Sequence, residues 1–168
     1  MKNWIQILQK VALMSFFLAF MACSNEDGQG VSGGAEEFVA EVAGVGTVSA
    51  SKDFDTISGT KIAAGGSNTV VLQGTDNSGK GFMLRLSTYN GTGTYDLGFS
   101  NIANTATYIG GTAAGQQYST SYQGTSGKIV VSSDDGKRLE GTFEFVGKLN
   151  NTSGAVTVTN GTFKVNLQ

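Results

Sequence analysis

The fold is decided by the stretch Val70-Val71-Leu72-Gln73-Gly74-Thr75-Asp76-Asn77-Ser78-Gly79-Lys80-Gly81-Phe82-Met83-Leu84-Arg85-Leu86. Apolar residues flank a short polar segment and alternate with other residues after it, as in two half-buried strands joined by a turn. A two-residue loop at Asn77-Ser78 would pair Leu72 with Met83, which faces away from Leu84. A three-residue loop with Gly79 at positive φ instead pairs Leu72 with Leu84 and Val70 with Leu86. The sequence therefore predicts the second hairpin.

The same alternation continues through most of the chain, which has 25 glycines and no proline. No long segment shows helical periodicity. About ten short strands in residues 36–168 predict a single all-β domain, either an antiparallel β-sandwich or a flattened β-barrel. The expected core consists of the phenylalanines on the apolar faces of these strands, namely Phe38, Phe82, Phe143, Phe145 and Phe163.

Two further turns bear on strand register. Asp134-Asp135-Gly136, read as a three-residue loop, pairs Val131 with Leu139 and Ile129 with Gly141. The apolar positions change from even to odd numbers around Asn160-Gly161. A hairpin turn and a β-bulge at Gly161 both explain that change, so both remain open.

Residues 1–22 have the parts of a secretory signal peptide: Lys2 and Lys10, an apolar run over residues 11–21, and the small residue Ala22. The uninterrupted apolar run is shorter than the ~20 residues of a membrane-spanning helix. Cys23, the one cysteine of the chain, follows directly. An unpaired cysteine in a secreted protein requires an explanation.

Residues 18–23, Leu-Ala-Phe-Met-Ala-Cys, resemble the bacterial lipobox, although Phe20 stands where Leu is usual. The resemblance implies that Cys23 becomes the first residue and carries acyl chains such as palmitate. Residues 23–35 are polar and glycine-rich, and as a flexible tether they would span ~20 Å. The acidic pair Glu26-Asp27 resembles the export signal of lipoproteins that face the cell exterior. We therefore expect a lipid-anchored outer-membrane protein; the periplasmic orientation stays open.

Composition argues against several function classes. The net charge is −2 and basic residues are not clustered, which disfavours nucleic acid as a partner. The chain has no histidine, and its one cysteine is the expected lipid site, so common Ser-His, Cys-His and zinc sites are excluded. We expect no cofactor and no catalytic residue.

Carboxylate pairs remain as candidates for enzyme or metal chemistry. Glu140 and Glu144 are four residues apart on one strand, roughly 13 Å at ~3.3 Å per residue, and this is too far for a joint hydrolytic role. Asp53-Phe54-Asp55 and Asp134-Asp135 are typical of turns that order their own backbone. We therefore predict no metal site.

Aromatic residues in polar stretches form the candidate binding surface: Tyr95, Phe99, Tyr108, Tyr118 and Tyr122. Tyrosine combines an apolar face with a polar tip and suits recognition of a glycan or a protein. The alternative is that these tyrosines cap the ends of a small β-core. Sequence alone leaves both possibilities open.

Four segments resemble short Bacteroidota lipoproteins that carry one β-rich domain of unknown function: residues 38–44, 127–131, 141–145 and 159–163. The resemblance implies a surface lipoprotein and supplies no catalytic residue. We expect a non-enzymatic domain that acts by binding or display. The first alternative is a small barrel with an internal apolar ligand cavity. The second is a carboxylate-based glycan-active enzyme.

Overall fold

The computed structural model describes residues 34–51, 55–111, 116–149 and 154–168. Within them the fold is all-β, and the single short helix is a 3-10 turn. The elements are β1 (Glu37–Val42), β2 (Gly46–Ser51), β3 (Thr56–Ala64), β4 (Ser67–Thr75), β5 (Lys80–Tyr89), β6 (Gly93–Gly98), η1 (Phe99–Asn101), β7 (Asn104–Gly110), β8 (Gln117–Ser119), β9 (Ser126–Asp134), β10 (Arg138–Leu149) and β11 (Ala155–Asn166).

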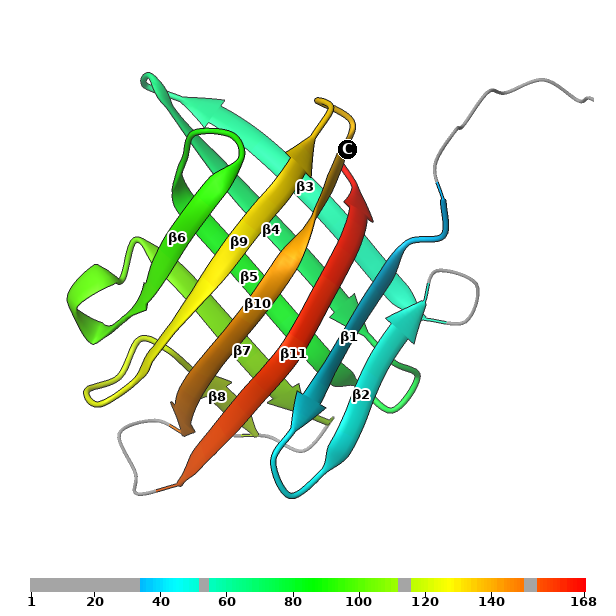
Figure 1. Cartoon of the computed structure of the whole chain (residues 1–168), viewed down its shortest axis with the longest axis vertical. Helices are drawn as coiled ribbons and strands as arrows, with labels where there is room; N and C mark the ends of the chain where they lie inside the picture. Colours follow the sequence, from blue (N-terminus) through cyan, green and yellow to red (C-terminus); the bar gives the residue numbers. More distant parts are fainter. Residues whose placement is uncertain (1–33, 52–54, 112–115, 150–153) are drawn as a thin grey trace, which may run out of the picture. The chain divides into compact units, whose positions relative to one another are not determined.

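All these strands belong to one antiparallel sheet that folds into two layers (Figure 1). The front layer contains β6, β9, β10, β11, β1 and β2, and the back layer contains β7, β5, β4 and β3. The long strand β10 joins the layers because it pairs with β9 along most of its length and with β8 at its end. On the other side, Gly59 of β3 bridges Leu167. The sheet is thus a nearly closed, flattened barrel.

Phenylalanine rings fill the space between the layers. Phe38 lies 6.1 Å from both Phe143 and Phe163, measured between ring centroids, and Phe82 lies 5.1 Å from Phe143. All five predicted core phenylalanines are at most 2% exposed, so that prediction is confirmed.

Two glycines make room for these rings within the front layer. Gly141 pairs with Phe163 and Gly161 with Phe143, each inside a Gly-Thr-Phe sequence. A Cβ at Gly141 would lie 2.6 Å from Phe163 Cζ, and one at Gly161 would lie 2.7 Å from Phe143 Cδ2. Each ring therefore covers the backbone of the neighbouring strand.

The predicted β4–β5 hairpin is confirmed. Leu72 pairs with Leu84 and Val70 with Leu86, and Gly79 has φ 75°. The Asp76 carboxylate accepts hydrogen bonds from the N–H groups of Ser78 (2.8 Å) and Lys80 (2.9 Å). Burial raises the pKa of Asp76, but the hydrogen bond from the Ser78 hydroxyl (2.6 Å) and these two backbone bonds outweigh it and lower the pKa.

The β9–β10 hairpin corrects the predicted register. Val131 pairs with Gly141 instead of Leu139, and Ile129 with Phe143 instead of Gly141. The Asp135 N–H donates to the Arg138 carbonyl (3.3 Å), so a shorter turn replaces the three-residue loop. That turn alone would place Ile129 and Val131 of β9 on the opposite face from Leu139 and Phe143 of β10. A bulge at Ser132 restores the alternation, which explains why the face was predicted correctly although the partners were wrong.

Strand β11 shows which alternative holds at Asn160-Gly161. The strand is continuous, and its register shifts by one residue near Asn160 against both β10 and β1. Asn160 takes φ 53°, a left-handed conformation that asparagine tolerates better than most residues. The change of parity is therefore a β-bulge within one strand.

Candidate functional site

The five aromatic residues predicted as a binding surface do not lie on one surface. Tyr95 and Tyr108 are 9% and 3% exposed and belong to the core, whereas Tyr118 and Tyr122 are half-buried. Only Phe99 is largely exposed, at 58%. The prediction is therefore wrong for Tyr95 and Tyr108, which agree with the alternative of tyrosines at the ends of a β-core.

Stacking and hydrogen bonds hold these buried tyrosines in place. Tyr95 stacks on Tyr89 at 5.8 Å, and its hydroxyl donates to the Gly91 carbonyl (2.6 Å). Tyr108 stacks on Tyr118 at 6.0 Å, and burial raises the pKa of Tyr108. Tyr95 and Tyr108 thus stabilise the core.

Phe99 forms an apolar tip together with Ile102, which is 63% exposed. We call these two side chains the apolar tip. Phe99 begins the 3-10 turn η1 between β6 and β7, and Ile102 follows its last residue. Asn101 holds this turn through a hydrogen bond from its Nδ2 to the Asp96 carbonyl (2.8 Å). The sequence prediction missed Ile102, although it is the second large apolar residue in a segment too short for a strand.

Arg138 and Asn166 hold the first described residues against β10 and β11. The Arg138 guanidinium donates to the carbonyls of Gly34 (2.5 Å) and Ala35 (3.2 Å) and pairs with Glu140 (2.8 Å). The Asn166 N–H donates to the Glu36 carboxylate (2.7 Å). We call these contacts the Arg138 clamp; they fasten the beginning of the domain to β10 and β11.

A polar brace joins the two layers near the β9–β10 turn. The Tyr89 hydroxyl donates to Asp134 Oδ2 (2.6 Å), and Lys61 Nζ lies 3.4 Å from the same oxygen and 5.0 Å from the Tyr89 ring centroid. Gly136 N–H donates to the other carboxylate oxygen (2.8 Å). The Tyr89 hydrogen bond is the main reason that the pKa of Asp134 is lowered, whereas burial and then this bond raise the pKa of Tyr89.

This brace suits a structural role better than catalysis because its groups engage one another. The adjacent Asp135 carboxylate accepts the N–H groups of Lys137 (2.8 Å) and Arg138 (2.6 Å), which lower its pKa. Within the described ranges, no three acidic, histidine or cysteine side chains come together as a metal site. Asp55 accepts the Ser51 N–H (2.9 Å), whereas Asp53 and Phe54 lie outside the described residues.

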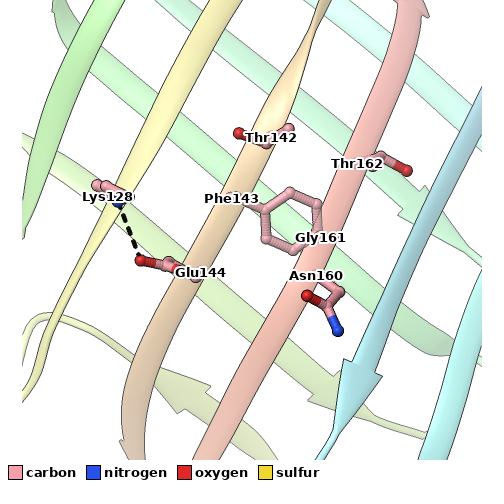
Figure 2. A pocket seen from close by; sticks show the side chains of 7 residues that line it. All are labelled: Lys128, Thr142, Phe143, Glu144, Asn160, Gly161 and Thr162. Atoms are coloured by element: carbon pink, nitrogen blue, oxygen red, sulfur yellow. Dashed lines mark ion pairs between the residues drawn. The ribbon is translucent and has the colours of Figure 1, made fainter.

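A shallow depression of about 360 Å³ lies on the outer face of β9, β10 and β11, and Phe143 and Gly161 belong to its lining (Figure 2). Lys128 and Glu144 point toward each other across it and form an ion pair of 3.2 Å. Thr142, Thr162 and Asn160 contribute hydroxyl and amide groups. Both charged side chains are about half-exposed, so the pair contributes little to stability. The depression therefore combines hydrogen-bonding groups with apolar lining, and its charged groups carry no net charge.

These features define the class of protein: a single all-β domain with two antiparallel layers, a packed aromatic interior and an apolar tip. Among the described residues, no helix is long and apolar enough to cross a bilayer. The chain belongs to the DUF6252 family, a domain of unknown function, whose family model matches residues 46–165. That range runs from the first residue of β2 almost to the end of β11. Neither the curated proteins nor the solved structures contain a match.

Proposed function

We propose that the protein is a lipid-anchored domain of the outer membrane that binds a partner through its apolar tip. Cys23 carries the acyl chains, and the predicted tether of residues 24–35 ends at the Arg138 clamp, which holds Gly34 and Ala35. The β-domain faces the cell exterior. The proposal assigns binding or display, without catalysis, to the domain. Cys23 lies outside the described residues, so the anchor rests on its sequence context.

The observation that carries the proposal is the exposure of Phe99 and Ile102 in one turn. Single exposed apolar residues are common, but adjacent ones that a fixed turn presents together are typical of interaction sites. The tip lies on the side of the domain away from the Arg138 clamp (Figure 1). A tether that begins at the clamp would therefore leave the tip accessible.

The aromatic interior disfavours the alternative of an internal apolar ligand. The ring contacts of Phe38, Phe82 and Phe143 occupy the centre of the space between the layers. A ligand there would have to displace fully buried side chains. The exposed tip needs no such rearrangement.

The anchor is tested by labelling cells that produce the full-length protein with an alkyne analogue of palmitate. We expect label on the wild type and on the Ser24→Ala control, and none on Cys23→Ser. Treating intact cells with a protease then tests orientation, because a displayed domain is cleaved before lysis. Label on Cys23→Ser would refute the anchor, and protection until lysis would refute display.

The tip is tested by comparing the double variant Phe99→Ser/Ile102→Ser with Val45→Ser/Ile62→Ser. Val45 and Ile62 are 51% and 54% exposed, so the control removes similar apolar surface elsewhere. Each protein is immobilised and exposed to outer-membrane and glycan extracts. Loss of a bound component from the tip variant alone supports the proposal. Equal retention by both variants would contradict it.

A further inference from the structure

The β-sheet has three strands that pair with a single neighbouring strand. These are β2, β3 and β6, whose partners are β1, β4 and β9. An open strand edge offers unpaired N–H and C=O groups to other chains, and natural proteins usually cover or charge such edges. The three edges of this domain differ in that respect.

Two of these edges are protected. Gly59 of β3 bridges Leu167 and accepts the N–H of Gln168 (2.9 Å), and Lys61 adds a charge to the same strand. In β6, the Asp96 carbonyl accepts Asn101 Nδ2, and the Asp96 side chain is charged. Neither edge is therefore suited to pair with another strand.

The β2 edge has no comparable protection over most of its length. Its sequence, Gly46-Thr47-Val48-Ser49-Ala50-Ser51, contains no charged residue. Figure 1 shows β2 at the margin of the front layer with no strand beyond it. Asp55 closes only the last position, because its N–H donates to the Ser51 carbonyl and its carboxylate accepts the Ser51 N–H, both at 2.9 Å.

The position of Ser51 identifies which other groups face the edge. In an antiparallel strand, alternate residues direct their N–H and C=O groups to the same side. Thr47 and Ser49 therefore direct theirs to the side of Ser51, away from β1. In the part of the chain that the structure describes, those two residues have no hydrogen-bond partner on that side. The open edge thus consists of two donors and two acceptors.

We propose that this edge pairs with the β2 edge of a second copy of the chain. A two-fold axis through Val48 places Thr47 opposite Ser49 of the other copy, and Ser49 opposite its Thr47. All the open donors then meet open acceptors, with no like charges opposed. The outward hydroxyl side chains face one another, as in stabilising cross-strand pairs. Val48 lies opposite its own counterpart, at a position without hydrogen bonds.

A disulfide at position 48 tests this register. Non-hydrogen-bonded antiparallel partners have Cα atoms ~4.5 Å apart, which is within the range for a disulfide. We expect purified Val48→Cys in a Cys23→Ser background to give a disulfide-linked homodimer under mild oxidation. The controls are the Cys23→Ser parent and, in the same background, Val45→Cys, which is more exposed but would lie roughly 20 Å from its counterpart at ~3.3 Å per residue.

A second variant tests the edge without a new thiol. Ser49→Pro removes an N–H that faces the edge and leaves the bonds between β2 and β1 intact, as prolines in edge strands require. By sedimentation of the full-length protein in detergent, we expect a concentration-dependent dimer for the wild type and Ser49→Thr, and a monomer for Ser49→Pro. An unchanged unfolding transition shows that the variant folds.

The outcomes separate this inference from the proposed function. A wild type that stays monomeric at its highest soluble concentration would overturn the dimer, as would equal cross-linking of Val48→Cys and Val45→Cys. A cross-link from position 48 to a different protein would also overturn it. The disulfide variants are made in a Cys23→Ser background and tested as purified protein, so that the introduced cysteine is the one thiol of the chain. The outcomes then do not depend on Cys23 lipidation or on the apolar tip.

Discussion

Gly74→Ala tests how closely the two layers approach. Gly74 lies in β4 of the back layer, and an ideal Cβ there would be 2.5 Å from Cδ2 and 2.8 Å from Cγ of Phe38 in the front layer. Phe38 is fully buried against Phe143 and Phe163, so its ring has little room to move. Forcing the extra methyl group into this packed space should cost about 1–3 kcal/mol of stability. Replacing glycine with alanine also restricts the unfolded chain, which offsets about 0.4–1 kcal/mol of that loss.

We therefore expect the free energy of unfolding of Gly74→Ala to fall by about 1–2 kcal/mol. Urea unfolding followed by circular dichroism measures this change, and an unaltered dependence on urea shows that the fold is retained. Thr60→Ala, on an exposed position of β3, is the control and should stay within about 0.5 kcal/mol of the wild type.

A double-mutant cycle tests the cause of this loss. Phe38→Ala alone should cost about 3–5 kcal/mol. In that background the methyl group of Gly74→Ala enters vacated space, so its own cost should disappear. The coupling energy should then be roughly 1–2 kcal/mol and favourable. Additive costs would refute the contact as the cause, and an unchanged stability of the single variant would refute the close approach itself.

Three further predictions concern polar groups of the fold. The lowered pKa of Asp134 stabilises the protein above the unfolded value of about 3.9, and this contribution is lost as pH falls through the folded pKa. The urea concentration at the unfolding midpoint should fall less steeply with decreasing pH below about pH 4 in Asp134→Asn than in the wild type. An equally steep fall would show that this carboxylate is not its source. Asn160→Val should cost about 1–2 kcal/mol because of the positive φ, while Asn160→Gly should remain as stable as the wild type. Arg138→Ala should speed amide hydrogen exchange at Glu36 and Glu37, and unaltered exchange would show that the clamp does not order this segment.

The sequence predicts the β4–β5 hairpin because two independent signals agree there. The apolar residues of both strands lie at even positions, so the loop must contain an odd number of residues to keep them on one face. Gly79 supplies the positive φ that a three-residue loop needs. At Asp134-Asp135-Gly136, parity is satisfied equally well by a three-residue loop and by a shorter turn with a bulge at Ser132. Alternation reports which face a residue occupies, but a bulge preserves the face while changing the partner.

The misplaced tyrosines show a different limit of sequence patterns. Tyr95 and Leu97 alternate around Asp96, and Tyr108 follows Ala106, so their inward direction was present in the sequence. Small and polar residues next to these tyrosines in the sequence made the alternation of apolar positions hard to recognise. The brace of Lys61, Tyr89 and Asp134 joins strands far apart in the sequence, and no local signal specifies that contact.

In the proposed lipid-anchored arrangement, the Arg138 clamp would link the anchor to the orientation of the apolar tip. The sequence predicts a flexible tether over residues 24–35, and the clamp shortens its free part to residues 24–33. Such a free part would span roughly 16–19 Å on average, at about 5–6 Å times the square root of length. The clamp holds Gly34, Ala35 and Glu36 to the domain. In Figure 1 the described chain begins beside β1, away from the turn that joins β6 to β7. Bringing the tip to the membrane would then require the domain to turn over on a short tether. Under the proposed surface display, a partner approaching from outside would meet the tip directly, so the clamp supports display over insertion of Phe99 and Ile102 into the lipid.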